Sequence, residues 1–497
     1  MDLRNRHAIP LAAVPVEPVE RFRETVVGAV RGGWRLVTMF GMPEGGDDTR
    51  LIAILAHDAR GALGATSAVV RDRYPALTPD CPQAHVFERE LAEQCAVCPD
   101  GHPWLKPLRR HLPDHRAPCR TDVVLDPDAY PFFRIDGEEV HEVAVGPVHA
   151  GIIEPGHFRL QAHGENVLFL EIMLGFQHRG IERLLETADP VRAVLVAESI
   201  AGDTVIGHVG AYCGAIEALA RSRKTPRAQT IRGLALELER LANHIGDLGA
   251  IAGDVAYQPA AAFFGRMRGE CLNALMTLSG NRYGRGLIRP GGVAFDVPAA
   301  MAAELRAKLE RLRDELSPVA TLMFESGSVQ GRLEGVGVVP RAQCLALGFV
   351  GPVARSCDVA RDVRHDHPYG IFRFAHIPVA TAWAGDVHAR ALVRWLEVRR
   401  SLEFVIEQLA ELPRGEPRVP CGALRPEELV VAMQEGWRGE IAHVVITDDR
   451  GGIRRHKVTD PSLHNWTAVA LALPGNQISD FPLCNKSFNL SYAGHDL

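Results

Sequence analysis

The stretch from Gly146 to Glu186, GPVHAGIIEPGHFRLQAHGENVLFLEIMLGFQHRGIERLLE, decides how the rest of the chain is organised. Two largely apolar runs within it, HFRLQA and ENVLFLEIML, are separated by HGEN, which is a turn signal. The segment GIERLLE then begins a helical pattern. We therefore expect two short strands followed by a helix, with a separate module before this stretch and a helical body after it.

Side chains that carry charge or move protons gather near the loops of this stretch. Groups of this kind in one place are candidates for a functional site. They are His149, His157, His178 and Arg179, with Glu182 one turn beyond Arg179.

The composition is that of an ordinary soluble globular protein with room for two to four domains. The chain has 497 residues, of which 46% are hydrophobic and 23% charged, and its net charge is −6. This negative balance gives no basic field for nucleic acid. No apolar run reaches the roughly 18 residues of a membrane span. The first residues contain no signal-peptide core, so a cytosolic or cytosol-facing location is expected.

Residues 1–125 are predicted to form a small α+β module. VEPVERFRETVVGAVRGG is typical of a helix that ends at a glycine pair, and two strand patterns, WRLVTMFGMP and TRLIAILAHD, flank the turn-rich EGGDD. ATSAVVRDRYPAL and HVFERELAEQC are each interpreted as a further helix. Residues 126–145, which contain prolines and cannot continue a helix, are predicted to be a linker.

Residues 146–497 are predicted to be a mostly helical bundle domain with small peripheral sheets, so the fold class is α+β. The clearest helix is TIRGLALELERLANHIGDLGA, whose apolar residues recur at alternating three- and four-residue spacing and so form a buried seam. Three more bundle helices are expected in residues 261–280, 302–316 and 391–412, and strands are expected from about Gly436. The seam residues are Ile231, Leu234, Leu238, Leu241, Ile245 and Leu248.

Several motifs occur in an order that is specific to one protein family. They are GPVHAGIIEPGHFRL, GEN and HRGIERL, then RAQTIRGLALELERLANHIGDLG and ARSCDVARDVRHDHPYG, and finally GWRGEIAHVVITDD and DPSLHNW. Over residues 140 to 497 they resemble the large subunit of group 4, membrane-bound NiFe hydrogenases and the D-type subunit of NADH–quinone oxidoreductase. The first module, with FERE and GHPWLKPLRRH, resembles the C-type subunit of that complex. The resemblance thus implies a C–D fusion, as in formate hydrogenlyase large subunits.

The resemblance allows the ligands of a NiFe centre to be checked position by position in this sequence. A NiFe centre needs four thiolates, which the family supplies as two CxxC pairs, because soft ligands hold nickel and low-spin iron. All four positions lack cysteine here, so we expect no NiFe centre and no hydrogenase activity of this chain alone, as in the energy-converting-hydrogenase-related members. Cys213 and Cys484 lie near the lost pairs and are interpreted as core residues. The four positions hold Ala201, Thr204, Ser491 and Gly494.

The resemblance to the D-type subunit also implies a quinone site. In that protein a loop histidine and a helix tyrosine lie at the quinone headgroup. His149 matches the loop histidine and is a candidate catalytic residue, with a loop histidine bonded to backbone as the structural alternative. Gly202 stands at the tyrosine position, and Tyr212 is a turn or more away. The quinone site is therefore only half matched.

Other positions keep the residue types of the family's redox site. Arg179 matches an arginine beside the terminal [4Fe–4S] cluster of a partner subunit, where a fixed cation raises the reduction potential of the cluster. His178 and His208 are assigned to the surroundings of the same cluster. The structural alternatives are a core ion pair for Arg179 and a bonded core histidine for His208.

Three carboxylate or histidine positions complete the implied site. Glu182 matches the glutamate that begins proton transfer in the hydrogenases, a role that burial would support by raising its pKa. Its alternative is a structural pair on its own helix. Asp366 and His367 are predicted to line the reaction cavity, with a polar loop network as the alternative.

Cys95 and Cys98 form the only CxxC of the chain. Further potential ligands lie nearby in the sequence, which keeps a zinc site open as an alternative. A single CxxC without a second pair is a weak signal, and the resemblance names no metal here, so none is predicted. The nearby residues are Cys81, His102, His111 and Cys119.

The sequence thus predicts a core subunit of a membrane-associated oxidoreductase assembly of the hydrogenase or NADH–quinone oxidoreductase type. It would line the cavity beside a partner's iron–sulfur cluster and couple electron transfer to protonation. The resemblance implies a small iron–sulfur subunit and integral membrane antiporter-like and anchor subunits as partners, a peripheral position on the cytoplasmic face of the inner membrane, and quinone and NAD binding. The alternatives are a non-catalytic scaffold subunit and, more distantly, a genuine NiFe hydrogenase with atypical ligands.

Overall fold

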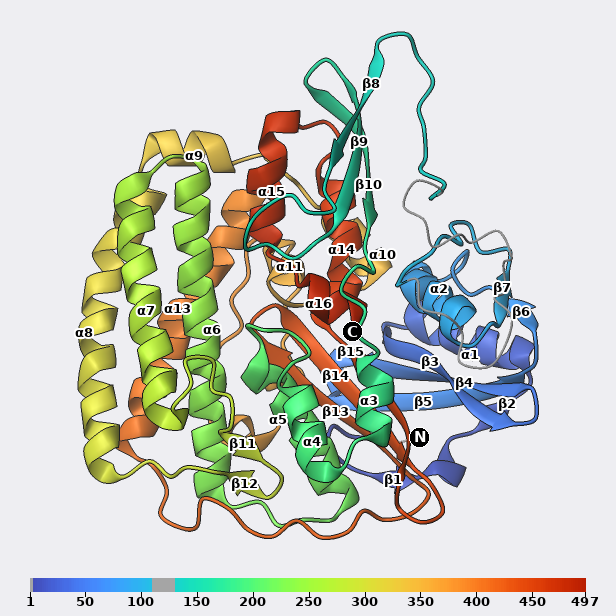
Figure 1. Cartoon of the computed structure of the whole chain (residues 1–497). Coiled ribbons are helices and arrows are strands. Elements are labelled where there is room, and N and C mark those ends of the chain that lie inside the picture. Colours follow the sequence, from blue (N-terminus) through green and yellow to red (C-terminus); the bar gives the residue numbers. More distant parts are fainter. Residues whose placement is uncertain (1–2, 110–129) are drawn as a thin grey trace.

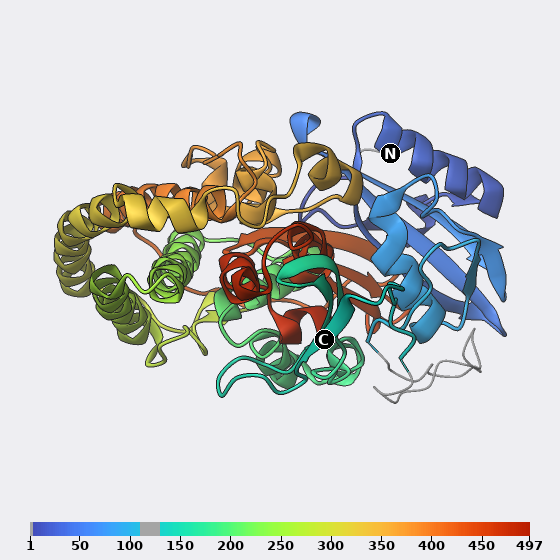
Figure 2. The ribbon, with the colours of Figure 1, turned by 90° about the horizontal axis from the view of Figure 1, so that it is seen from above.

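The computed structural model describes residues 3–109 and 130–497. It contains an N-terminal α/β domain, a bundle of long helices, and between them a buried sheet (Figure 1). Seen from above, the bundle and the N-terminal domain lie at opposite ends of an elongated molecule (Figure 2). The buried sheet and its helices therefore join the two ends.

The N-terminal domain is a four-stranded sheet covered on both faces. Leu51 and Leu55, on one face of the sheet, pack into a core shared with the two helices of this domain. Ile52 and Ile54, on the other face, pack into the core of the second domain. Burial on both faces explains the unbroken apolar run LIAILA. The elements, with strands in sheet order, are β2 (Val16–Glu17), β5 (Ala62–Val70), β4 (Asp48–His57) and β3 (Arg35–Gly45), with helices α1 (Val19–Arg31) and α2 (His85–Gln94).

The helix predicted for ATSAVVRDRYPAL is wrong. Its first half belongs to β5, which pairs with β4 along its whole length, and its end forms β6 (Arg73–Pro75), which pairs in parallel with β7 (Cys98–Asp100). Small and β-branched residues suit a strand that is covered on both faces. Pairing with β4 therefore overrides the helical pattern of this segment.

The four predicted bundle helices are confirmed. The seam residues of the longest helix are at most 1% exposed. Thr225 caps this helix by accepting a hydrogen bond from the Ala228 amide, and Pro226 suits its first turn. The bundle helices are α6 (Pro226–Asp254), α7 (Gln258–Ser279), α8 (Ala299–Phe324) and α13 (Val387–Ala410), and α6 packs against both α7 and α13.

The sheet between the bundle and the N-terminal domain contains strands from both ends of the chain. Its order is β1 (Ile9–Pro10), β13 (Glu428–Gly436), β14 (Gly439–Thr447) and β15 (Ile453–Thr459), all antiparallel. One face packs on α5 (Val205–Leu219). From the other face Thr459 bonds to Thr38 of the N-terminal domain at 2.9 Å. The α+β fold class is confirmed, but this sheet is central and not peripheral, because every residue of β13 and β14 is buried.

A second, three-stranded sheet is peripheral. Its hairpin, β9 (His157–His163) and β10 (Asn166–Met173), confirms the two strands predicted from the opening stretch. Strand β8 (Val140–Val145) pairs with β9, so the end of the segment interpreted as a linker is a strand. Residues 126–129 of that segment lie outside the described residues.

Short helices connect these parts. Within the described ranges, no helix is both long and apolar enough to cross a membrane. The helices near the functional site are α3 (Ile181–Thr187), α4 (Pro190–Ala197), α14 (Pro461–Ala472), α15 (Phe481–Phe488) and α16 (Tyr492–Asp496). The remaining elements are β11 (Ile288–Arg289), β12 (Gly292–Val293), α9 (Gly327–Leu333), α10 (Arg341–Leu347), α11 (Gly351–Ser356) and α12 (Val363–Asp366), with short 3-10 turns.

A buried ionic network ties the bundle to the central sheet. The carboxylate of Glu397 accepts hydrogen bonds from Arg355 Nε at 2.8 Å, Arg240 Nη1 at 3.0 Å and His244 Nε2 at 2.9 Å. Arg355 also donates to Glu435 of β13 at 2.8 Å. Burial alone would raise the pKa of Glu397, but Arg355, His244 and Arg240 hold it well below its usual value. The carboxylate therefore stays charged and anchors α13.

Replacing Glu397 with alanine should strongly destabilise the protein. Glu397→Ala removes an anion that Arg355 and Arg240 share, and breaking a buried ion pair typically costs about 3–5 kcal/mol of unfolding free energy. The measurement is the urea midpoint for loss of helical circular dichroism. Glu304→Ala is the control, because it removes only an exposed partner of Lys308 on α8. Equal midpoints for both variants would show that the network does not stabilise the fold.

Candidate functional site

The four positions that the resemblance matches to metal ligands are all buried, and one arginine connects the two segments that carry them. The guanidinium of Arg179 donates to the Ile200 carbonyl at 2.7 Å and to the Ala493 carbonyl at 3.4 Å. It therefore joins the segment that enters α5 to the segment that forms α16. We call this place the four-position site, and its members are Ala201, Thr204, Ser491 and Gly494, all buried.

The hydroxyls of the four-position site are already bonded within the protein. Thr204 Oγ1 accepts hydrogen bonds from Trp437 Nε1 and Arg438 Nη1, each at 3.1 Å. Ser491 Oγ accepts from the Gly494 amide at 2.8 Å and so caps α16. Neither hydroxyl is a soft ligand, and the other two positions have no donor atom.

A carboxylate occupies the space beside Gly494. A side-chain carbon added at Gly494 would lie 2.6 Å from Cγ and Oδ2 of Asp460. Asp460 Oδ1 accepts from the Ser462 amide at 2.7 Å and caps α14, and Oδ2 accepts from His208 Nε2 at 2.9 Å. Burial alone would raise the pKa of Asp460, but His208 and Ser462 hold it below its usual value. A fixed anion thus fills the place toward which a side chain at Gly494 would point.

Arg179 is held by carbonyls and remains exposed. Its Nη1 donates to the Ser199 carbonyl and its Nη2 to the Ile200 carbonyl, each at 2.7 Å, and its amide donates to the Leu497 carbonyl at 2.8 Å. Among the residues that the structure describes, no carboxylate forms a salt bridge with it. The core ion pair left open by the sequence is therefore not its role here.

His178 fastens the loop before α3 to α16. Its Nδ1 lies 2.8 Å from the Asp496 carbonyl, and the Asp496 carboxylate accepts from the amides of Gly175 and Gln177 at 2.9 and 2.8 Å. These bonds make the loop that carries Arg179 continuous with the end of the chain. The placement of His178 and His208 near a partner's cluster stays a prediction.

Glu182 is a structural anion. Its Oε1 accepts from Lys457 Nζ at 2.9 Å and the Val458 amide at 3.0 Å, and its Oε2 accepts from Arg455 Nη2 at 2.8 Å and Gln94 Nε2 at 3.2 Å. Burial alone would raise its pKa, but Lys457 and Arg455 hold it well below its usual value. The expectation of a raised pKa is therefore wrong. The carboxylate stays ionised and joins α3 to β15 and the N-terminal domain.

His149 lies beside a tyrosine that the sequence did not suggest. Its Nδ1 is 3.2 Å from the Pro147 carbonyl, and its Nε2 is buried without a partner among the described residues. The ring of Tyr492 lies 6.1 Å from the His149 ring, centroid to centroid. Tyr212 instead stacks on His456, at 5.8 Å. The tyrosine at this loop is thus Tyr492 of α16.

Asp366 and His367 lie at the interface between the two domains. The Asp366 carboxylate accepts from the Asp362 amide at 3.0 Å, and His367 Nε2 lies 3.1 Å from Oδ1 of Asp58 in the N-terminal domain. Their prediction as cavity-lining residues is corrected, because Asp366 bonds within its own loop and His367 bonds across to the N-terminal domain. They are part of the polar loop network that was the alternative.

The isolated cysteines of the second domain are core residues, as expected. Cys213 and Cys484 are 0% exposed. Burial raises the pKa of Cys213 to about 12 and that of Cys484 to about 11. Both thiols are therefore protonated at neutral pH and are poor metal ligands.

The CxxC of the N-terminal domain does not present two free thiols. Cys98 is disulfide-bonded, and burial raises the pKa of the free Cys95 to about 11. Within residues 3–109 and 130–497, no group of three or more His, Cys, Asp and Glu side chains is arranged to hold a metal. Two of the other zinc candidates, His111 and Cys119, lie outside the described residues.

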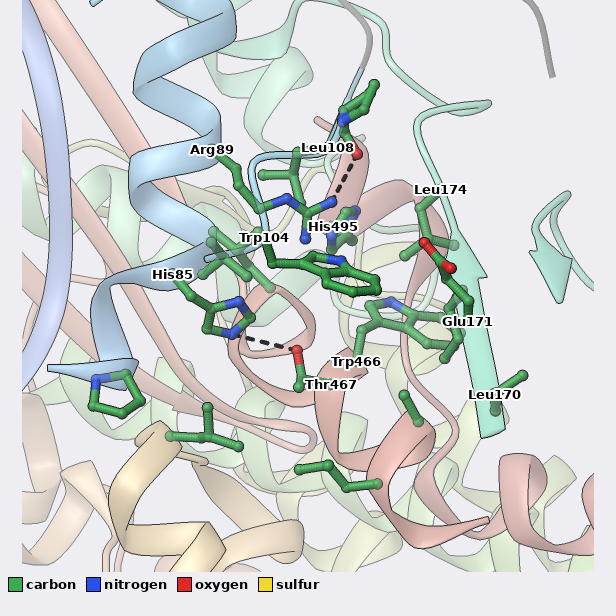
Figure 3. Close-up of a pocket in the computed structure, with 18 of the residues that line it drawn as sticks. His85, Arg89, Trp104, Leu108, Leu170, Glu171, Leu174, Trp466, Thr467 and His495 are labelled. Carbon is green, nitrogen blue, oxygen red and sulfur yellow. Dashed lines mark hydrogen bonds between the residues drawn. The ribbon is translucent and has the colours of Figure 1, made fainter. Parts of the chain in front are cut away.

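A separate cavity of about 390 Å³ lies where α2 meets α14 and β10 (Figure 3). Trp104 and Trp466 are among its aromatic walls, and His85 Nε2 lies 3.4 Å from Thr467 Oγ1 across it. Arg89 donates to the Pro107 carbonyl at 2.7 Å. These polar groups are satisfied within the protein, and none of the predicted site residues lines this cavity.

Comparisons with known proteins identify a matching family and several related proteins. Residues 254–423 match the family described as "Respiratory-chain NADH dehydrogenase, 49 Kd subunit". Formate hydrogenlyase subunit 5 of Escherichia coli (strain K12) is 29% identical over 441 residues, covering 86% of this chain and 77% of the relative. The carbon monoxide-induced hydrogenase of Rhodospirillum rubrum is 30% identical over 353 residues, covering 70% of this chain and 97% of the relative.

A solved structure and a further relative extend these matches. One chain in the structure of the membrane-bound sulfane sulfur reductase, an archaeal respiratory membrane complex, matches with a TM-score of 0.68 and 26% identity, over 73% of this chain and 100% of that chain. The D 2 subunit of the NADH-quinone oxidoreductase of Herpetosiphon aurantiacus is 30% identical over 346 residues, covering 68% of this chain and 94% of the relative.

The fold and the four-position site define a large subunit of the NiFe-hydrogenase type whose ligand positions carry no thiolate. The chain belongs to the family that contains the large subunits of group 4 membrane-bound hydrogenases and the D-type, 49-kDa subunit of NADH–quinone oxidoreductase. The match to the formate hydrogenlyase protein covers more of the chain than residues 146–497 contain, so it includes part of the N-terminal domain. Two of these relatives are named as subunits of larger enzymes, and the matching solved structure is that of a respiratory membrane complex.

Adding one methyl group at position 494 should destabilise the protein. Gly494→Ala forces a carbon against the Asp460 carboxylate, and such overpacking typically costs about 1–3 kcal/mol of unfolding free energy. Gly202→Ala is the matched control, because nothing lies within 4 Å of its added carbon. Thermal melts compare the two variants. An unchanged melting temperature for Gly494→Ala would show that Asp460 does not fill this space.

The stabilising effect of Glu182 should depend on pH in a defined direction. Its pKa in the folded state lies well below 4.5, its ordinary value, so its contribution is complete above about pH 4.5 and falls as the pH drops below that value. Urea midpoints of wild type and Glu182→Gln should therefore differ clearly at pH 7 and converge in more acidic solution. A difference that grows on acidification would contradict the assigned ion pairs.

Proposed function

We propose that this chain is a redox subunit of a membrane-associated assembly, in which Arg179 lies against the terminal iron–sulfur cluster of a small partner subunit. The observation that carries the proposal is the state of Arg179. It is exposed, oriented by backbone carbonyls, and without a salt-bridge partner in the described part of the chain. A fixed cation of this kind stabilises the reduced state of a neighbouring cluster and raises its potential.

Apolar side chains near Arg179 support a docking face for that partner. Val148 and Ile152, in the loop between β8 and β9, are 82% and 98% exposed. Glu154 of the same loop accepts from the Ala493 amide at 3.0 Å, which brings the loop beside Arg179. Exposed apolar residues that gather in one place mark protein contacts. On this proposal the face is covered by the small iron–sulfur subunit, and antiporter-like and anchor subunits hold the assembly on the cytoplasmic side of the inner membrane.

The same proposal includes no NiFe centre in this chain. The four-position site offers two bonded hydroxyls and no thiolate, and the Asp460 carboxylate occupies the space beside Gly494. A soft bimetallic centre does not fit this donor set. Electrons would therefore leave the partner's cluster for a separate acceptor.

A quinone-like acceptor is favoured by the surroundings of His149. A quinone carbonyl accepts hydrogen bonds from N–H and O–H groups. His149 Nε2 has no partner among the described residues, and the ring of Tyr492 lies nearby. These two residues would take the place of the histidine and tyrosine of the D-type subunit. The competing proposal is a scaffold subunit, which the glycine at position 202 and the missing thiolates favour.

Removing the positive charge at Arg179 separates the two proposals. In the assembly purified with its partners, Arg179→Ala should lower the midpoint potential of the nearest cluster by roughly 60 mV, a tenfold change for one electron, and slow turnover. Arg179→Lys should lower the midpoint potential of the cluster less than Arg179→Ala does, because lysine keeps the positive charge but lacks the planar guanidinium group. Potentiometric titration followed by EPR gives the values.

The control for this experiment is Arg306→Ala, which removes an exposed arginine paired with Glu310 on the bundle helix α8. It should leave the potential and the turnover as they are. If Arg179→Ala behaves like the control, the chain acts as a scaffold.

A further inference from the structure

Three histidines and Asp460 form a continuous line of hydrogen bonds behind the four-position site. His208 Nε2 is 2.9 Å from Asp460 Oδ2, and His208 Nδ1 is 3.3 Å from His443 Nε2. The line continues with His443 Nδ1, which is 3.0 Å from His456 Nε2. All four side chains are 0% exposed. We call this line the histidine chain.

The periodicities of a helix and a sheet bring these rings together. His208 and Tyr212 are one turn apart on α5 and so lie on one side of it. In the central sheet Val445 pairs with His456, and His443 stands two residues before Val445, so both histidines lie on one face. Helix α5 packs on that face. The contact of helix and sheet therefore places the rings in register.

One arrangement of protons satisfies every bond of the histidine chain. The Asp460 carboxylate only accepts, so His208 donates from Nε2, and a singly protonated His208 then accepts at Nδ1. His443 then donates from Nε2 and accepts at Nδ1, and His456 donates from Nε2. Burial lowers the pKa of His443 well below its usual value and that of His456 to about 3, so both stay neutral at pH 7. Nδ1 of His456 is left as a buried acceptor without a partner among the described residues.

The open end of the histidine chain lies one side chain away from a second cavity. Tyr212 stacks on the His456 ring with an angle of 4° between the planes, and it also lines a cavity of about 770 Å³ beside α4 and α5. Glu186 lines the same cavity and accepts from the His456 amide at 3.0 Å. The other end, Asp460, lies against Gly494. The line thus runs from a cavity wall to the four-position site.

We propose that the histidine chain is a proton path from this cavity to the four-position site. Once the Tyr212 ring moves aside, a hydronium ion gives its proton to Nδ1 of His456. Each Nε2 proton then passes to Nδ1 of the next ring, and the Nε2 proton of His208 passes to Oδ2 of Asp460. One proton enters, one carboxylate is neutralised and no electron moves. The rings are left with their protons on Nδ1, and transfer of one proton back along the line from Asp460 restores the starting arrangement.

This path deepens the proposed function and rests on it, because an electron that arrives beside Arg179 supplies the demand for a proton. His208 and Ser462 keep the Asp460 carboxylate ionised in the resting protein. The negative charge of an added electron favours its protonation, so Asp460 takes up the proton only in the reduced assembly. The path uses only side chains of this chain and the water of the cavity.

Reduction of the assembly tests the path. Dithionite reduction of the purified complex, followed by infrared difference spectroscopy, should produce a protonated-carboxyl band that Asp460→Asn removes. His443→Phe keeps a ring but loses both nitrogens, so it should slow the band roughly a hundredfold while EPR shows unchanged reduction of the cluster. His464→Phe, which removes another buried histidine outside the line, should behave like wild type. Absence of the band in wild type, or an equally fast band in His443→Phe, overturns the path.

A second measurement on the wild-type full chain does not depend on how the variants fold. With ¹⁵N-labelled imidazoles, His443 and His456 should each be neutral with the proton on Nε2 at pH 7, and Nδ1 of His208 should accept the hydrogen bond from His443. A charged ring, or a proton on Nδ1 of any of them, overturns the path. The two proposals fail separately: an unchanged cluster potential in Arg179→Ala removes the redox role, whereas the tautomer pattern decides the path alone.

Discussion

The carboxylate of Asp460, fixed by His208 and the Ser462 amide against Gly494, is the interaction on which the rest of this site depends. It caps α14, it bonds α5 through His208, and it fills the space from which a ligand at α16 would extend. Helices α14, α5 and α16 therefore converge on a buried anion. The same anion accepts the first hydrogen bond of the histidine chain, from His208 Nε2.

Charge is divided between the surface and the interior of this region. The cation of Arg179 is oriented by carbonyls, which hold it without neutralising it, and it stays exposed. The anion of Glu182, three residues further along the chain, is buried and saturated by Lys457 and Arg455. One short loop and helix thus direct a positive charge outward and use a negative charge to join the domains. This division suits a subunit that influences a partner's redox centre without holding one itself.

The bundle could be predicted from the sequence because its signal is local. The seam from Ile231 to Leu248 repeats along one helix, and burial of that seam needs no knowledge of what lies opposite. The segment ATSAVVRDRYPAL, by contrast, has a pattern that suits a helix or a strand, and only its pairing with β4 makes its first half a strand. Long-range contacts likewise decide which strands are central. The sequence predicts strands after Gly436, but it does not predict that α5 buries them.

The candidate site divides in the same way. Arg179 and the four ligand positions follow from motif order alone. The pKa of Glu182 could not be foreseen, because Lys457 and Arg455 are about 270 residues away in sequence and reach it only through the position of β15. His443 and His456 gave no signal, since only the strand register brings them together. Asp460 does carry a signal in the sequence, because an aspartate followed by proline at the start of a helix is typical of a helix N-cap.

The short strand β1 has a practical meaning for handling this protein. It comes from the start of the chain, yet it forms the edge of the central sheet beside β13, and Asn5 exchanges hydrogen bonds with the backbone of Met433. If the N-terminal domain were separated from the second domain, β1 would be lost from the sheet. The backbone amides and carbonyls of β13 that pair with it would then be unpaired, and exposed strand edges of this kind promote aggregation. Both ends of the chain thus contribute strands to the central sheet, so the N-terminal domain and the second domain are not independent units joined only by a linker.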